Sequence, residues 1–275
     1  MDPEKFKPLA NALKFNRTVT KFEFRGDHIG GRGAKMLAEA LMINRTISII
    51  HIGANCFDPD GVRALGKSLR FNQGVTTVDL GTSTAGAGGA EAFFCALTTN
   101  RTLQKLAIRR YRIELSSVGM LADALKVNKT LTELELEVND IGVEGIQKLA
   151  EALKINRTVT HIKLEHNRLG SGSACALAEA LNVNNTLTDI SLRSNNIGAV
   201  GAEALAEALT TNQGLTTIDL EYNEIGPEGA QSFAQALQIN QTLKKVKLGS
   251  NKIGEKGSKA LAAVTRNGLE LSFYH

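Results

Sequence analysis

Apolar and polar residues alternate with two different periods inside one stretch of the chain, 184–211, which reads NNTLTDISLRSNNIGAVGAEALAEALTT. Around Ile190 and Leu192 apolar and polar residues alternate one by one, which predicts a half-buried strand over 190–192. A turn signal follows at 195–198. Four apolar residues then recur at helical spacing, with Glu203 and Glu207 on the opposite face: Ala202, Leu205, Ala206 and Leu209. We therefore predict a strand, a turn and a helix in this unit.

The same unit recurs every 28 residues without an insertion. Its first residue is, in order, Asn16, Asn44, Asn72, Asn100, Asn128, Asn156, Asn184, Asn212 and Asn240. A period between about 20 and 50 residues is typical of a solenoid, in which each unit buries its apolar face against the next one. Stacked in register, such units place all strands in one parallel sheet. We expect the strands on a concave face and the helices on a convex face.

The repeats resemble a known family. Leu187, Ile190, Leu192 and Asn195 fit the leucine-rich-repeat pattern L-x-x-L-x-L-x-x-N, and an Ile-Gly turn and an L-A-x-A-L segment follow. Repeats of this kind are similar to the ribonuclease-inhibitor class, which includes ribonuclease inhibitor, the repeat domains of NOD-like receptors and the Ran GTPase-activating protein. The resemblance covers nearly the whole chain. It implies an α/β leucine-rich-repeat solenoid, a horseshoe with parallel strands inside and α-helices outside.

The unbroken period predicts a single domain over residues 1–275. Residues 1–15 form a capping helix that Asp2 and Pro3 open, 16–267 hold nine repeats, and 268–275 end the chain with a strand. Phe273 and Tyr274 are expected to seal the last repeat.

Composition narrows the possible functions. A net charge of +4, 5% aromatic residues and no Trp do not point to nucleic acid. The three cysteines are too few and too scattered for a disulfide framework or a zinc site, and we expect Cys95 and Cys175 to be buried free thiols in helices. No signal peptide, lipidation motif or 18-residue apolar run is visible, so the expected location is cytoplasmic, without membrane association.

Seven repeats begin with the glycosylation pattern N-x-T, at Asn16, Asn44, Asn100, Asn128, Asn156, Asn184 and Asn240. We interpret them as structural, because the repeat places each Asn at a helix-to-strand turn where its amide can bind backbone groups. A second Asn follows most strands and should form a buried ladder: Asn55, Asn139, Asn167, Asn195, Asn223 and Asn251. Asp27 can replace it in part, whereas Ser83 and Tyr111 cannot. Residues 81–117 thus break the rule and are predicted to be the softest part, through function or through drift.

Charged residues line the predicted concave face. The column Arg109, Glu137, Glu165, Arg193 and Glu221 places neighbours about 4.8 Å apart. Such pairs either neutralise one another, at about 0–1 kcal/mol each, or form an electrostatic template for a partner, which we favour. Tyr222 is the best aromatic anchor. The predicted partner-binding residues are Arg109, Arg110, Glu135, Glu137, Lys163, Glu165, Arg193, Asp219, Glu221 and Tyr222.

No catalytic, cofactor or metal site is predicted. Glu133, Glu135 and Glu137 project from one strand, but an open sheet face lacks the burial that acid–base catalysis requires. His161 and His166 have no third ligand at metal-site spacing and are expected to be surface residues. The glycine-rich stretch 86–89 has no G-K-S/T after it, so it is no phosphate loop.

These observations favour a non-enzymatic protein–protein interaction module, a scaffold that binds a protein on its concave sheet. Two alternatives stay open from the resemblance. One is a GTPase activator of the Ran-activator type, although that family's acidic C-terminal tail is missing. The other is the ligand-sensing repeat domain of a NOD-like receptor. Self-association through the C-terminal strand edge is a further possibility.

Overall fold

The structure is a computed structural model that describes residues 3–26, 29–82, 89–264 and 267–273. By its internal contacts the chain divides into two compact units, Met1–Asn139 and Asp140–His275. In each unit helices and strands alternate along the chain, as the two periods predict.

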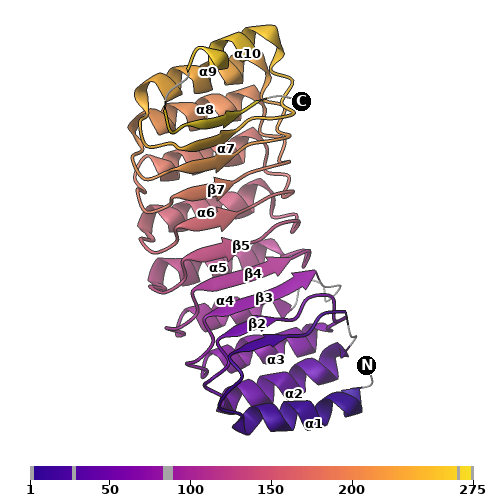
Figure 1. Cartoon of the computed structure of the whole chain (residues 1–275). Coiled ribbons are helices and arrows are strands. Elements are labelled where there is room, and N and C mark those ends of the chain that lie inside the picture. Colours follow the sequence, from indigo (N-terminus) through magenta and orange to yellow (C-terminus); the bar gives the residue numbers. More distant parts are fainter. Residues whose placement is uncertain (1–2, 27–28, 83–88, 265–266, 274–275) are drawn as a thin grey trace. The chain divides into compact units, whose positions relative to one another are not determined.

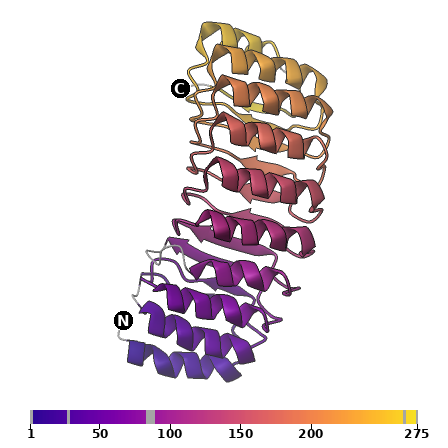
Figure 2. The ribbon, with the colours of Figure 1, turned by 180° about the vertical axis from the view of Figure 1, so that it is seen from behind.

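The first unit contains five helices and five strands in its described part. They are α1 (Pro3–Phe15), β1 (Lys21–Glu23), α2 (Gly30–Ile43), β2 (Ile49–His51), α3 (Pro59–Leu69), β3 (Thr77–Thr82), α4 (Glu91–Leu97), β4 (Lys105–Arg109), α5 (Leu115–Val127) and β5 (Glu133–Glu135). Each strand pairs in parallel with the next one in sequence, for example Ile50 with Val78. The helices lie side by side on one face of this sheet (Figures 1 and 2).

The second unit repeats the arrangement. It consists of α6 (Gly142–Ile155), β6 (His161–Lys163), α7 (Gly170–Leu181), β7 (Asp189–Ser191), α8 (Gly198–Thr211), β8 (Thr217–Asp219), α9 (Gly226–Ile239), β9 (Lys245–Lys247), α10 (Gly254–Ala262) and β10 (Glu270–Ser272). Strands β6 to β10 are again parallel and in sequence order, with Ile190 opposite Ile218. This arrangement confirms the predicted α/β solenoid fold, although β7 starts one residue earlier than predicted.

The core lies between the strands and the helices of each unit. Leu187, Ile190 and Leu192 are at most 2% exposed, and Ala202 and Leu205 of α8 are fully buried opposite them. Burial of one such leucine or isoleucine side chain contributes about 1.5–3 kcal/mol. The apolar positions of the repeat are therefore what drives adjacent repeats together.

The predicted asparagine ladder after the strands is present. Asn195 is fully buried, and its Nδ2 donates hydrogen bonds to the carbonyl oxygens of Leu164 (2.8 Å) and Leu192 (2.9 Å). Its Oδ1 accepts a hydrogen bond from the backbone N of Asn167 at 2.7 Å. Asn223 makes the same contacts one repeat later, with its Oδ1 accepting from the backbone N of Asn195. One side chain thus satisfies backbone groups of its own repeat and of the preceding one.

The asparagines at the helix ends form a second ladder. Asn44 is fully buried and donates from Nδ2 to the carbonyl oxygens of Leu13 (2.7 Å) and Asn16 (2.9 Å). Its Oδ1 accepts from the backbone N of Thr46 and of Ile47, both at 2.8 Å. These contacts confirm the structural interpretation of the N-x-T pattern, because the amide is already used inside the fold.

The turns after the strands use the left-handed backbone region. Ser194 (φ +57°) and Asn196 (φ +56°) flank the ladder residue, and Gly198 (φ +68°) opens α8. A non-glycine residue costs about 1–2 kcal/mol in this region. The turn is where the sequence predicts it, but the left-handed residues lie on either side of Asn195.

The irregular stretch 81–117 is described only in part, because residues 83–88, with Ser83, lie outside the described residues, as do Asp2, Asp27 and Tyr274. Tyr111 replaces a ladder asparagine and is fully buried, and its backbone N donates to Oδ1 of Asn139 at 2.7 Å. The pairing of β3 with β4 shifts register between Asp79 and Thr82. At Gly81 (φ +57°) a Cβ would lie 2.5 Å from the Cα of Gly53, so only glycine fits there.

The cysteine prediction is wrong in one respect. Cys95 is exposed and Cys175 is half-buried, so neither is buried as predicted, and Cys56 is exposed as well. Cys95 lies on α4, whose buried residues are its neighbours Ala92, Phe93, Phe94, Ala96 and Leu97. A cysteine among apolar neighbours in sequence can still face solvent, because a helix turns by about 100° per residue.

Candidate functional site: the open sheet face

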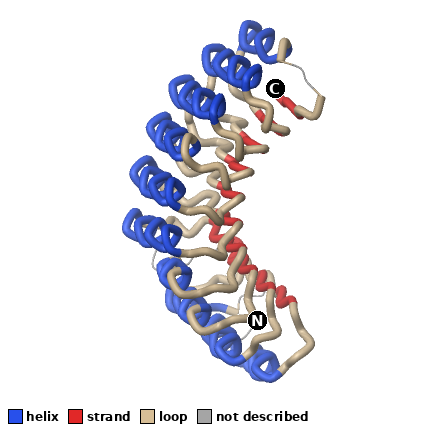
Figure 3. Tube along the Cα trace, turned by 90° about the vertical axis from the view of Figure 1, so that its left-hand side faces the viewer, coloured by secondary structure: helices blue, strands red, loops and turns tan. Residues whose placement is uncertain are grey.

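The sheet of each unit has one face without helices, which we call the open sheet face and which corresponds to the predicted concave face. Figure 3 shows the strands of each unit on the side away from its helices. In β6 the middle residue Ile162 is buried toward the helices, and His161 and Lys163 are exposed on the open face. The strand's alternation therefore decides which side chains a partner could contact.

In the first unit, Arg109 at the end of β4 lies among three carboxylates. Its Nη1 lies 2.9 Å from Oδ1 of Asp79, and its Nε lies 3.1 Å from Oε1 of Glu137. Its Nη2 pairs with Oε2 of Glu135. The other oxygen of Glu135 is 2.9 Å from Nζ of Lys105, which also pairs with Glu133 at 2.9 Å. We call these six residues the Arg109 cluster.

Burial distinguishes the Arg109 cluster from an ordinary surface ion pair. The side chain of Glu135 is only 4% exposed, and that of Arg109 is 26% exposed. Burial alone lowers the pKa of Arg109, but Glu137, Asp79 and Glu135 outweigh it and raise the pKa above its usual range. Burial also lowers the pKa of Lys105, but hydrogen bonds to Glu135 and Glu133 outweigh that effect. The pKa of Lys105 is therefore raised. The expectation that the open face offers no burial is therefore wrong for Glu135.

In the second unit, Arg193 connects the end of β7 to the residues after β8. Its guanidinium pairs with Oε2 of Glu221, and its Cζ lies 4.5 Å from the ring centroid of Tyr222. Tyr222 is 51% exposed and takes a left-handed backbone, φ +58°. The cation over the ring face limits the positions of the ring, so the exposed aromatic group is held in place.

The remaining predicted residues occupy separate positions. Asp219 is 8% exposed and pairs through Oδ2 with Nζ of Lys247 at 2.8 Å. Lys163 is exposed and Glu165 half-buried, both in the repeat of β6. Arg110 is exposed on a left-handed turn (φ +60°), and its backbone N donates to the carbonyl oxygen of Glu137 at 3.2 Å.

Two pairs of neighbours in the predicted column thus form ion pairs within their units: Arg109 with Glu137, and Arg193 with Glu221. The sequence did not reveal that Asp79 and Lys105 belong to the Arg109 cluster, or that Lys247 pairs with Asp219. Residues 79 and 109 belong to different columns, and their side chains meet along a diagonal of the sheet. Long side chains reach diagonal neighbours in a sheet. A comparison of residues in adjacent columns of neighbouring strands would therefore have predicted the contact between Asp79 and Arg109.

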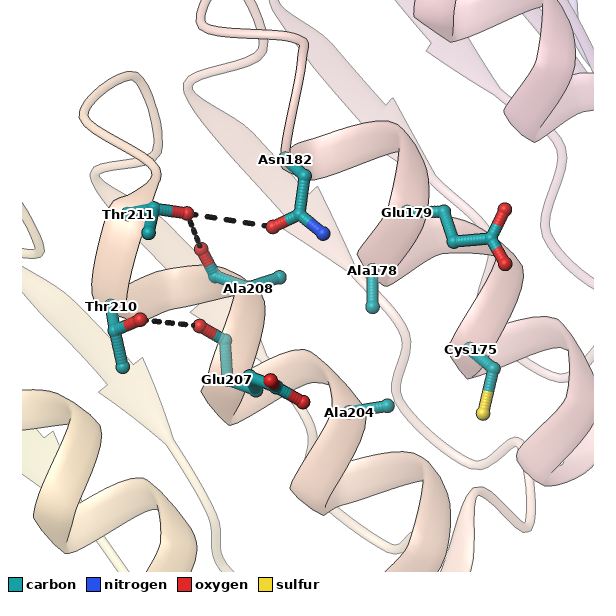
Figure 4. Close-up of a pocket in the computed structure, with 9 residues that line it drawn as sticks. All are labelled: Cys175, Ala178, Glu179, Asn182, Ala204, Glu207, Ala208, Thr210 and Thr211. Carbon is teal, nitrogen blue, oxygen red and sulfur yellow. Dashed lines mark hydrogen bonds between the residues drawn. The ribbon is translucent and has the colours of Figure 1, made fainter.

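The helix side of the second unit has a shallow open hollow of about 390 Å³ between α7 and α8. Figure 4 shows Cys175, Glu179 and Asn182 on one wall, and Glu207, Thr210 and Thr211 on the other. The hydroxyl of Thr210 donates to the carbonyl oxygen of Glu207 at 2.7 Å, so this hydroxyl is used in a hydrogen bond at the end of α8. The hollow has no convergent set of polar groups, which a small-molecule site requires.

His161 and His166 are exposed, as predicted. Nε2 of His161 lies 3.2 Å from Oδ2 of Asp189. Over the described ranges no group of three or more His, Cys, Asp or Glu side chains has an arrangement that could hold a metal ion. No helix in the same ranges is long and apolar enough to cross a membrane.

Comparison with known proteins identifies the fold class. The family model for the leucine-rich repeat matches residues 127–150, 183–206, 211–234 and 240–262. These matches confirm the resemblance to leucine-rich-repeat proteins seen in the sequence, and the fold is that of a leucine-rich-repeat solenoid. None of the curated proteins compared with the chain matches it.

Among solved structures, the chain is similar to the leucine-rich-repeat-containing protein LegL7 from Legionella pneumophila. The TM-score is 0.59 at 17% identity, over 98% of this chain and 86% of that one. The tropomodulin C-terminal domain of Caenorhabditis elegans has a TM-score of 0.48 at 15% identity, over 55% of this chain and 92% of that one. For leiomodin-1 actin-binding site 2 the TM-score is 0.39 at 18% identity, over 75% and 88%. The likeness to LegL7 concerns the fold alone, and the other two are too distant to bear on function.

Proposed function

We propose that this chain is a non-enzymatic protein–protein interaction module that binds a protein partner on its open sheet faces. The observation that carries the proposal is Tyr222, an exposed aromatic ring held under the Arg193 guanidinium. Tyrosine and arginine are enriched among the residues that dominate binding energy. A ring whose position is already limited loses little conformational entropy when a partner covers it.

The charge of the Arg109 cluster supports the proposal and indicates the chemistry of the partner. The cluster holds four carboxylates, those of Asp79, Glu133, Glu135 and Glu137, but only two cations. Its carboxylates are only partly neutralised, and the cations fix their positions. We propose that this part of the open sheet face contacts basic groups of the partner, which raises the association rate and excludes acidic proteins.

The proposal includes a cytoplasmic location. Six of the seven N-x-T asparagines, those after Asn16, are at most 3% exposed. A glycan could not be attached there without opening the fold. Cys56 and Cys95 are exposed cysteines, which fits a reducing compartment.

Affinity capture from a lysate of the source cells, read by mass spectrometry, tests the proposal. Three tagged proteins are compared: the wild type, an Arg193→Glu/Tyr222→Ala variant, and a control with Lys148→Glu and Val200→Ala on the helix side. Lys148 and Val200 are both exposed, so the control repeats the charge reversal and the truncation away from the sheet.

A protein retained by the wild type and the control, and lost by the Arg193→Glu/Tyr222→Ala variant, supports binding on the open sheet face. Circular dichroism must first show that all three proteins are folded. The same set of captured proteins from all three would refute the site.

A further inference from the structure

A row of exposed apolar side chains runs along one edge of the first unit. Phe15, Ile43 and Phe71 each immediately precede a helix-end asparagine and are 72%, 45% and 60% exposed. Met42, next to Ile43, is 48% exposed. We call these four residues the edge row. They lie at the C-terminal ends of three consecutive helices, α1 to α3, and serve neither the core nor the open sheet face.

The asparagine ladder holds the edge row in register. The backbone N of Asn16, of Asn44 and of Asn72 each donates to the carbonyl four residues earlier, at 3.1, 2.8 and 3.0 Å. Nδ2 of Asn44 binds the carbonyl oxygen of Asn16, and Nδ2 of Asn72 binds that of Asn44, both at 2.9 Å. Because equivalent atoms repeat with equivalent bonds, the side chains before these asparagines project from equivalent positions along the edge.

The edge row is surrounded by positive charge. The three segments read Lys-Phe-Asn-Arg at 14–17, Met-Ile-Asn-Arg at 42–45 and Arg-Phe-Asn-Gln at 70–73, with no acidic residue. Arg17, Arg45 and Arg70 are exposed, whereas Lys14 pairs with Glu39 at 3.3 Å. Residues 1–82 contain 12 Lys and Arg against 8 Asp and Glu, so they account for the whole net charge of +4.

The arginines have a partial structural role that does not explain the apolar residues. Nη1 of Arg17 lies 3.4 Å from the carbonyl oxygen of Asn16, and Nη1 of Arg45 lies 3.4 Å from that of Leu41. A cation at a helix C-terminus is favourable because of the helix dipole. Two phenylalanine rings exposed by more than half at the same edge gain nothing from that effect. Contiguous exposed apolar side chains rimmed by charge are typical of an interaction surface.

We propose that the edge row binds the surface of an anionic lipid membrane. Phe15 and Phe71 enter the boundary between headgroups and acyl chains, and Arg17, Arg45 and Arg70 contact lipid phosphates. Basic and aromatic residues on one surface are the combination that interfacial membrane binding uses. A second copy of the edge is disfavoured as occupant because two basic surfaces repel each other. The rings project from the protein instead of lining a groove, which suits a surface they can enter better than a peptide.

The expectation of no membrane association rested on the lack of a spanning segment, and binding at a membrane surface needs none.

The second unit supplies an internal control. Its equivalent positions are Ile155, Val183, Thr211 and Ile239, and the residues two places later are Arg157, Asn185, Gln213 and Gln241. Val183 and Ile239 are 50% and 61% exposed, but no cation follows them. Of the four residues two places later only Arg157 is basic, and its Nη2 lies 3.4 Å from the carbonyl oxygen of Val183. With one arginine against three beside the edge row, this edge is expected to bind anionic lipid much more weakly.

Co-sedimentation of the full chain with vesicles tests the proposal. One set of vesicles is phosphatidylcholine alone, and the other contains phosphatidylserine as about one quarter of the lipid. The wild type should sediment with the anionic vesicles only, and less so as salt is raised. Phe15→Ser/Phe71→Ser should lower the partition coefficient about tenfold or more. Arg17→Gln/Arg45→Gln should lower it about 30-fold. The matched control Val183→Ser/Ile239→Ser should bind like the wild type.

The six substituted residues are all exposed, so the variants keep the buried hydrogen bonds of the ladder, and circular dichroism checks their folding. No sedimentation with anionic vesicles at low salt would overturn the proposal. Sedimentation with phosphatidylcholine alone would also overturn it. So would full binding by the Phe15→Ser/Phe71→Ser variant or by the Arg17→Gln/Arg45→Gln variant. Equal loss in the Val183→Ser/Ile239→Ser control would also overturn it, because binding would then not be specific to this edge.

Discussion

The guanidinium carbon of Arg193 lies 4.5 Å from the centroid of the Tyr222 ring, and the same guanidinium pairs with Glu221. Arg193 follows β7 and Tyr222 follows β8, and these two strands are parallel neighbours. One cation thus holds an anion and an aromatic ring on the adjacent repeat.

We predict a coupling energy of about 0.5–1 kcal/mol between Arg193 and Tyr222 in the free energy of unfolding. A double-mutant cycle with Arg193→Ala and Tyr222→Ala, measured by urea unfolding, gives this value. The exposed pair Lys252–Glu224, at 3.2 Å, serves as a comparison and should couple by no more than about 0.5 kcal/mol. A coupling energy of zero for Arg193 and Tyr222 would mean that the ring is not held.

Replacement of Asn195 by alanine should destabilise the second unit by about 3 kcal/mol or more. The change removes three hydrogen bonds of a buried amide and leaves the backbone N of Asn167 without its acceptor. The carbonyl oxygens of Leu164 and Leu192 each keep one bond, from Asn167 and from Asn223. An unsatisfied buried polar group costs about 1–3 kcal/mol. Asn182→Ala, at an exposed helix end, should change the free energy of unfolding by less than about 0.5 kcal/mol. Thermal or urea unfolding compares the two variants, and equal effects would contradict the ladder's importance.

Arg109→Ala should cost about 2–3 kcal/mol at neutral pH, because Asp79, Glu135 and Glu137 then face one another without the central cation. Adding Glu135→Gln to that variant should recover about 1 kcal/mol, since it removes the most buried of the three negative charges. Urea unfolding of the single and double variants measures both effects. If Glu135→Gln destabilises the Arg109→Ala variant further, repulsion between carboxylates is not the cause.

Lys105 provides a pH test of the same cluster. Folding raises its pKa above the ordinary 10.5 through its bonds to Glu135 and Glu133, which overcome the effect of burial. A base with a raised pKa stabilises the fold at pH values below its ordinary pKa, and the effect is lost as pH rises through the raised value.

The difference in unfolding free energy between wild type and Lys105→Met should therefore be constant from about pH 7 to pH 9.5 and shrink above about pH 10.5. In a Glu133→Gln/Glu135→Gln background only burial acts on the pKa of Lys105 and lowers it, so the difference should no longer shrink with rising pH and should increase instead. A difference that grows with pH would have the wrong sign for this mechanism.

The repeat unit could be predicted from the sequence because its period of 28 residues leaves one register for strands and helices. The same register placed the ladder asparagines and the pairs Arg109–Glu137 and Arg193–Glu221. Burial of Glu135 could not be predicted, since it depends on how far the side chains of Lys105 and Arg109 extend across the sheet. Exposure of Cys95 depends on the rotation of the short helix α4, which apolar neighbours in sequence do not determine. The sequence shows that the edge-row residues precede asparagines spaced by 28 residues, but it does not show that their side chains are exposed.

The helix-end asparagines bear on how this gene can change. Asn212, for example, donates from Nδ2 to the carbonyl oxygens of Leu181 and Asn184 at the end of the preceding helix, and its Oδ1 accepts from the backbone N of Gly214 and Leu215 in its own repeat. An in-frame duplication of codons 184–211 would supply a unit whose donors and acceptors match those on both sides. Recombination between repeats can therefore lengthen or shorten the protein in single steps, and natural variants of this gene should differ by whole multiples of 28 codons.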